Sequence, residues 1–111
     1  MKVRNFQEVE PEAYIEGAKG VTFRVMIGER EGAPNYVMRH FHIDPGGYTP
    51  YHSHPWEHEI FIIEGEGVIK VKGEERVLRP GDSVFIPPDE EHQFIASETK
   101  DLNLICVIPR V

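Results

Sequence analysis

The sequence contains a single cysteine, Cys106, among its 111 residues. No disulfide can form within the chain, so its stability must come from packing, as is usual in a reducing compartment. Long hydrophobic runs are also missing, and none approaches the roughly 18 consecutive apolar residues that a membrane helix needs. The segment from Met1 to Pro11 lacks the apolar core of a secretory signal. These absences predict a cytoplasmic protein with no membrane partner.

Positive charge is scarce as well. The chain has 12 Lys and Arg residues against 19 Asp and Glu, a formal net charge of −7. No nucleic-acid partner is expected, because phosphate binding needs a basic stripe and the basic residues do not cluster. A small molecule is the better expectation. Two Gln and three Asn beside many Glu form a weakly thermophile-like composition. A chain of this length buries about 65% of its unfolded surface, which suits one domain, residues 1–111.

Ten Gly and nine Pro residues leave little room for long helices. They separate short runs that alternate with period two, which is typical of strands. We therefore predict an all-β fold, a barrel or jelly roll over residues 21–109, preceded by an irregular arm or edge segment, residues 1–20. Turns are expected at residues 45–47, 72–74 and 79–82. The predicted strands are Val21–Ile27, Tyr36–Ile43, Glu59–Ile63, Gly67–Lys72, Glu75–Leu78, Ser83–Ile86, Gln93–Ala96 and Leu102–Ile108.

One predicted strand should have both faces covered. Within residues 59–63, apolar side chains stand at successive positions instead of alternating with polar ones. The interior of a small barrel covers only one of these faces. A homodimer that packs sheet on sheet would cover the other, and the alternative is the N-terminal segment folding back. We favour the homodimer.

Four of the six histidines form a pattern typical of a metal site. His52 and His54 stand at i and i+2, and such residues of an extended segment point the same way about 6.5 Å apart. Their imidazoles can then converge on one ion at about 2.1 Å each. Pro55 breaks the strand, so that a short turn can bring His58 to the same centre, and His92 would arrive from a neighbouring strand. Surface histidines in a polar turn are the alternative. Imidazole suits Zn, Cu, Fe, Ni and Mn.

These histidines belong to two motifs that resemble those of the cupins. The resemblance covers the chain from about Val21 to Pro109 and implies a single-domain cupin β-barrel, also described as a double-stranded β-helix. Asp89 and Ala96 depart from the family's Gly and Asn, which affects the turn geometry but not the ligand set. The matching positions are Gly46, His52, His54, His58 and Gly65 in the first motif and Gly81, Pro87, Asp89, His92 and Ala96 in the second.

The acidic position of the first motif has two candidates. A three-residue spacing gives His58, and the four-residue variant of the motif gives Glu59. Four neutral imidazoles would leave a 2+ charge undiminished, whereas Glu59 would cancel one charge. The stretch of residues 54–61 is similar to the small four-histidine manganese cupins of hyperthermophilic bacteria, which favours His58. The resemblance thus implies one divalent ion per chain, manganese first and Fe, Cu, Ni or Zn as alternatives, held by His52, His54, His58 and His92.

Further side chains are expected around the ion. Alternation places Arg39 on the inner face of its strand, where it would orient an anionic substrate or donate a hydrogen bond to a bound oxygen species, as a candidate catalytic residue. The alternative is an arginine at a strand end that reaches solvent. Cys106 is either a small buried residue or a thiol near the metal, open to oxidation. The predicted substrate pocket comprises Phe41, Tyr48, Trp56, Ile60, Phe94, Leu104, Cys106 and Ile108.

Four protein ligands leave two positions of an octahedral ion free for a substrate or dioxygen. We therefore predict a metal-dependent oxidoreductase, dioxygenase-like, that acts on a small apolar or aromatic molecule. One alternative is a non-catalytic, metal-dependent module that binds or senses a small ligand. The resemblance also admits a sugar isomerase, but the largely apolar predicted pocket disfavours a sugar, which needs many polar partners.

Overall fold

The structure is a computed structural model that describes residues 1–110. Apart from two three-residue 3-10 helices, Phe6–Glu8 and Glu29–Glu31, the regular structure in this range is all strand. No helix among these residues is long and apolar enough to cross a membrane. The predicted all-β fold is confirmed. The strands are β1 (Lys19–Ile27), β2 (Tyr36–Tyr48), β3 (His58–Gly65), β4 (Gly67–Val71), β5 (Glu74–Leu78), β6 (Ser83–Ile86), β7 (Gln93–Ala96) and β8 (Leu102–Pro109).

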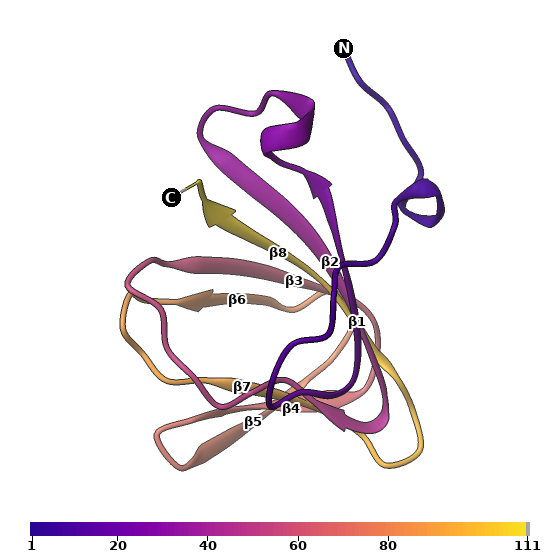
Figure 1. Ribbon diagram of the computed structural model, residues 1–111. Helices are drawn as coiled ribbons and strands as arrows, with labels where there is room; N and C mark the ends of the chain where they lie inside the picture. The colour runs from indigo at the N-terminus through magenta and orange to yellow at the C-terminus, as the bar shows by residue number, and fades with distance from the viewer. Residues whose placement is uncertain (111) are drawn as a thin grey trace.

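The eight strands form one sheet in the order β5-β4-β7-β2-β8-β3-β6, with β1 paired to β2 beside this path. Every strand pair is antiparallel. Figure 1 shows the sheet curling, so that β3 and β6 lie across from the layer of β4, β5 and β7. The long strands β2 and β8 connect the two layers. This curled sheet is consistent with the predicted barrel.

Strand β2 is longer than the sequence predicts. The expected turn at residues 45–47 is wrong, because the strand continues to Tyr48 over 13 residues. The pairing with β1 shifts register between Val21–Ile43 and Lys19–Tyr48, which marks an irregularity in the ladder. Gly46 takes a φ of 75° there, and its N–H donates to the carbonyl of Ser97. Strand β2 therefore passes through this irregularity without ending, and the segment with His52 follows it.

The hydrophobic core lies inside the curl of the sheet. Ile43, Ile62, Ile86 and Leu102 are fully buried, and burying a side chain of this size contributes about 1.5–3 kcal/mol to folding. On β3, His58, Ile60 and Ile62 are buried in alternation with exposed neighbours. A side chain at the start of this strand thus projects into the same interior as the core.

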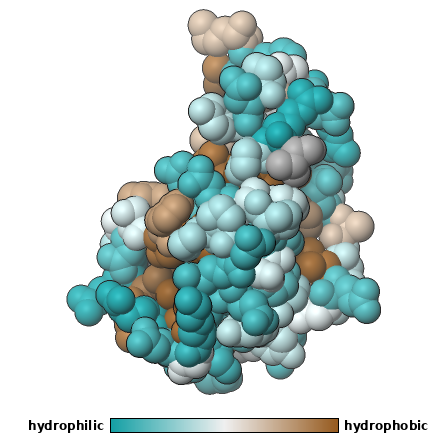
Figure 2. Space-filling model, turned by 90° about the vertical axis from the view of Figure 1, so that its left-hand side faces the viewer, coloured by the Kyte–Doolittle hydropathy of each residue, from teal (hydrophilic) through white to brown (hydrophobic). Residues whose placement is uncertain are grey.

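The outer face of β3 remains uncovered within residues 1–110. Phe61 is 50% exposed and Phe85 on the adjacent strand β6 is 60% exposed. The N-terminal segment instead follows β1, where the guanidinium of Arg24 donates to the carbonyl of Val9 at 2.9 Å. The alternative that this segment covers β3 is therefore wrong. Figure 2 shows one face of the molecule, on which apolar side chains interrupt a mostly hydrophilic surface.

Candidate metal centre

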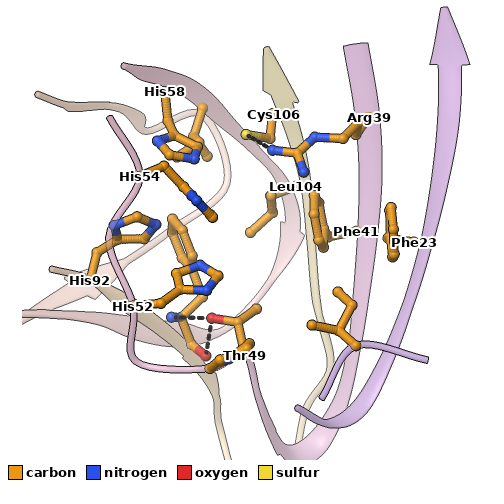
Figure 3. A pocket seen from close by; sticks show the side chains of 14 residues that line it. Phe23, Arg39, Phe41, Thr49, His52, His54, His58, His92, Leu104 and Cys106 are labelled. Carbon is orange, nitrogen blue, oxygen red and sulfur yellow. Dashed lines mark hydrogen bonds between the residues drawn. The ribbon is translucent and has the colours of Figure 1, made fainter. Parts of the chain in front are cut away.

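Four histidines from three segments of the chain gather beside one cavity (Figure 3). His52 and His54 lie on the segment after β2, His58 begins β3, and His92 directly precedes β7. A backbone bridge joins two of these segments. The N–H of His52 donates to the carbonyl of His92 at 3.1 Å, and the N–H of His92 donates back at 2.9 Å. Backbone pairing alone therefore holds together histidines 40 positions apart.

Alternation decides which side chains face inward. Ser53 and Pro55 are exposed, whereas His52 and His54 are half-buried. His58 is only 4% exposed and lines the interior. Glu59, the other candidate for the same motif position, is exposed on the opposite face of β3, beside Phe85 of β6. The placement favours His58 over Glu59 as the third ligand of this segment.

The spacing of the rings fits a shared ion. Imidazoles that bind one ion at about 2.1 Å have ring centroids about 4.5–6.5 Å apart. Five pairs among the four rings have centroid separations of 4.4, 4.8, 5.2, 5.3 and 6.4 Å. The ring nitrogens do not yet meet, however, since within residues 1–110 no three His, Cys, Asp or Glu side chains are arranged to hold a metal ion. Binding of an ion would require the rings to turn.

The environment keeps the four rings neutral, as metal ligation requires. Burial, reinforced by His54, His92 and Arg39, lowers the pKa of His52 to about 4. Burial, together with His92 and Arg39, lowers the pKa of His58 to about 3. Burial also lowers the pKa of His54 and of His92, although the carbonyl of Glu90 opposes the shift at His92. At neutral pH each ring therefore carries a free lone pair.

Two contacts orient individual rings. The Nδ1 atom of His92 lies 2.9 Å from the carbonyl of Glu90. It must be the protonated nitrogen, which leaves Nε2 as the donor toward a metal. The indole of Trp56 stacks on His54 at a centroid distance of 4.6 Å and an angle of 3°. By contrast, Nδ1 of His58 is buried without a partner among residues 1–110, so an electrophile at this position would satisfy an otherwise orphaned ring. These observations fit a divalent ion.

A cavity of about 310 Å³ opens beside the four rings. Arg39 lines it, and the Nη2 group of Arg39 donates to Sγ of Cys106 at 3.2 Å (Figure 3). Of the predicted pocket residues, Tyr48, Trp56 and Ile108 lie outside the lining. Those that do line the cavity are Phe41, Ile60, Phe94, Leu104 and Cys106.

Sequence reasoning missed four residues of the cavity wall: Ile15, Phe23, Thr49 and Pro50. Phe23 had a usable signal, since it alternates with Val21 and Val25 on β1, and its ring stacks on Phe41 at 5.2 Å. Thr49 carries the single hydroxyl group among the lining residues, and that hydroxyl accepts from the N–H of Phe94 at 2.9 Å. Ile15 belongs to an irregular segment, and no local pattern indicates its long-range contact.

A model of the cupin domain matches residues 39–108. This chain belongs to the cupin family. It is similar to the polyketide cyclase RemF from Streptomyces resistomycificus, at 34% identity and a TM-score of 0.92, over 98% of this chain and 79% of that one. It is also similar to an oxalate-binding protein of Thermotoga maritima, at 29% identity over 97% of this chain and 93% of the relative. A predicted oxalate decarboxylase from Thermotoga maritima superposes with a TM-score of 0.84 at 27% identity, over 99% of this chain and all of that one (100%).

The structure explains one departure from the cupin pattern. Asp89 replaces the motif glycine and has a φ of 68°, in the left-handed region that Asp tolerates better than most residues. Its N–H donates to the carbonyl of His54 at 2.7 Å. The turn therefore keeps the glycine-like conformation and ties the second cupin motif to the first.

Proposed function

We propose that this cupin binds one divalent metal ion through His52, His54, His58 and His92 and acts as an oxidoreductase, dioxygenase-like, on a small apolar or aromatic molecule. The proposal rests on one observation: four neutral imidazoles line a cavity of about 310 Å³ whose other walls are largely apolar. Manganese is the first expectation for the ion. When bound, such an ion supplies Lewis acidity and a route for electrons.

The remaining wall of the cavity suits an apolar molecule. Phe23, Phe41, Ile60, Phe94 and Leu104 surround the space next to the histidines. They would hold an apolar body and exclude water from it, which strengthens electrostatic interactions inside. Thr49 offers little to a substrate, because its hydroxyl already bonds the backbone of Phe94. This lining disfavours a sugar, whose hydroxyls need many polar partners.

The proposal is tested first by elemental analysis of protein purified without affinity tag or chelator. We expect a near-stoichiometric redox-active metal, Mn, Fe or Cu. Oxygen uptake is then measured with a small aromatic chelator such as catechol, for the metal-loaded and the metal-free protein. Uptake only in the loaded form would support an oxidoreductase. Absence of metal, or zinc alone that survives loss of the histidines, would overturn the proposal.

A second candidate function is a module that binds a small ligand without turning it over. The similarity to an oxalate-binding protein over 97% of this chain favours it. Calorimetry with the metal-loaded protein separates the two candidates. Saturable binding of catechol or oxalate without oxygen uptake or product formation would support the binding module, whereas turnover would exclude it.

We also propose that the protein is a homodimer, joined through the outer face of β3 and β6. Phe61, Ile63 and Phe85 are 50%, 43% and 60% exposed there, and large apolar side chains that are exposed together on a sheet face are typical of interaction sites. Sedimentation velocity of the native protein should show a dimer, and Phe61→Ser together with Phe85→Ser should shift it to a monomer. A native monomer would contradict this proposal without affecting the metal site.

A further inference from the structure

The cavity contains one charged side chain without a charged partner. Arg39 projects from β2 into the cavity, and none of the 14 lining residues is Asp or Glu. Within residues 1–110, no ion pair involves Arg39. An uncompensated charge among apolar side chains is costly to bury. An anionic group bound at this point would compensate the charge of Arg39.

The protein partners of the guanidinium leave much of it unused. Nη2 donates to Sγ of Cys106 at 3.2 Å, and Cζ lies 5.0 Å from the ring centroid of Phe41. Nε is buried with no hydrogen-bond partner, and Nη1 makes no hydrogen bond to residues 1–110. Figure 3 shows the guanidinium at the end of the cavity, on the side opposite His92. Because Nε is enclosed by protein atoms and Nη2 bonds Cys106, Nη1 is the donor left for a molecule in the cavity.

No neighbour supplies the missing negative charge. The thiol of Cys106 is almost fully buried, and burial raises its pKa, although the charge of Arg39 opposes the shift. At neutral pH the thiol is therefore uncharged. The four histidines of the cavity wall cannot supply a negative charge either, because an imidazole side chain is neutral or positive. The guanidinium is thus the single permanently charged side chain that lines the cavity.

We propose that Arg39 anchors the carboxylate of the substrate, and that the substrate is a monocarboxylate with an apolar or aromatic body. This inference rests on the proposed function, because it assigns a substrate class to the same cavity. A carboxylate accepts charge-assisted hydrogen bonds from the planar guanidinium and cancels its single charge. Phe23, Phe41 and Leu104 then pack around the body of the acid. Arg39 is the single Lys or Arg side chain that lines the cavity, and its one charge matches the one charge of a monocarboxylate.

The rival interpretation is that Arg39 has only a structural role, through its contacts with Cys106 and Phe41. The two roles predict different measurements. A structural arginine would affect the melting temperature and leave ligand preference unchanged. A carboxylate anchor would affect the preference for a charged ligand over its neutral isostere, even in the absence of metal.

The experiment compares phenylacetate with phenylacetamide, which has a similar shape but no charge. Binding of each is measured by calorimetry to the metal-free and to the manganese-loaded protein, for the native chain, Arg39→Met and Arg39→Lys. Arg76→Met is the matched control, because Arg76 is exposed on β5 outside the cavity. Melting curves and near-ultraviolet circular dichroism establish that each variant is folded.

We expect metal-free native protein to bind phenylacetate at least about tenfold more tightly than phenylacetamide, as hydrogen bonds to a charged group suggest. Arg39→Met should abolish this preference, Arg76→Met should keep it, and Arg39→Lys should keep part of it, because it retains the charge but not the planar fork. If Arg39→Met does not fold, Arg39→Lys still decides the question through its reduced preference.

Several outcomes would overturn the anchor. These are equal binding of the two ligands by the native protein, no binding of phenylacetate in either metal state, or an unchanged preference in both Arg39 variants. If phenylacetate binds only to the manganese-loaded protein and equally well to Arg39→Met, the metal alone holds the carboxylate, and the proposed metal function stands while the anchor fails. If the preference depends on Arg39 but the protein binds no metal, the anchor stands and the proposed metal function fails.

Discussion

The chain contains two His-x-His pairs with identical spacing, and the fold treats them differently. His52 and His54 meet two further histidines beside the cavity. His40 and His42 lie on the outer face of β2. There the ring of Phe6 covers His40 at a centroid distance of 4.8 Å, and Nε2 of His42 lies 2.9 Å from a carboxylate oxygen of Asp101. Spacing therefore supplies two ligands at most, and long-range strand contacts decide whether a site is completed.

The largest expected effect comes from removing one ring of the inner pair. His54→Ala should weaken manganese binding more than about 100-fold, because loss of an outer partner alone typically costs 10–100-fold. At a metal concentration 100 times the native Kd, the variant should also lose about 2.7 kcal/mol of metal-dependent stabilisation. Elemental analysis and thermal melts with and without manganese measure both quantities. His42→Ala is the matched control and should retain the metal; equal metal content in the two variants would remove the distinction between the pairs.

The second test concerns the neighbours at the start of β3. His58→Ala should remove most of the bound metal, because His58 faces the interior, whereas Glu59→Ala should leave the metal content unchanged, because Glu59 is exposed on the other face. Metal content of the purified variants is the measurement. Loss of metal in Glu59→Ala with retention in His58→Ala would assign the motif position to the carboxylate.

A smaller effect is expected from the contact that orients His54. The indole of Trp56 lies flat on this ring, so Trp56→Ala should weaken manganese binding about tenfold, at the low end of the range for outer partners of metal ligands. Trp56→Phe preserves a stacking surface and should recover most of the affinity. Competition with a chelator of known affinity gives the ratio. If both variants bind like the native protein, the stack does not position the ring.

The smallest expected effect concerns the outer pair. Burial, together with the charges of Arg24 and His42, lowers the pKa of His40 from 6.5. The unfolded chain therefore binds a proton at His40 more strongly than the native protein does. The native protein loses stability as the pH falls below about 6.5. Phe6→Ala exposes the ring and should cost about 1 kcal/mol at pH 7. This cost should shrink toward pH 5, because the pKa of the exposed His40 returns toward its ordinary value.

Urea unfolding of the native protein and of Phe6→Ala, at pH 7 and at pH 5, measures the cost of the substitution in stability at each pH. The lowered pKa values of the four cavity histidines are common to both proteins and cancel. A difference in stability that stays constant between pH 7 and pH 5 would show that Phe6 does not control the ionisation of His40.

Much of the fold could be predicted from local sequence patterns. The strands Ser83–Ile86 and Gln93–Ala96 have the predicted bounds, because alternation and flanking turn residues are local signals. The irregular passage of β2 through residues 45–47 was not predictable in this way. There, β1 pairs with Ile43 and Tyr48 on either side of the stretch, and the N–H of Gly46 donates to the carbonyl of Ser97, so the strand continues despite the turn preference of Pro and Gly.

The same distinction between local patterns and long-range contacts applies to the site. The inward alternation of His52, His54 and His58 follows from their spacing, but the contact between Arg39 and Cys106 joins residues 67 positions apart. It depends on the register of β2 against β8, in which these two residues are direct partners. No local pattern in a single sequence contains that register, and the same limit applies to Ile15 and Thr49 in the cavity wall.

The backbone bridge between His52 and His92 has a consequence for how the centre would be assembled. Because two distant segments are already paired by reciprocal amide bonds, an incoming ion does not have to bear the loop-closure entropy of bringing them together. The backbone around His52 and His92 is thus joined before any ion binds, and a chelator should be able to remove a bound ion while the barrel stays folded.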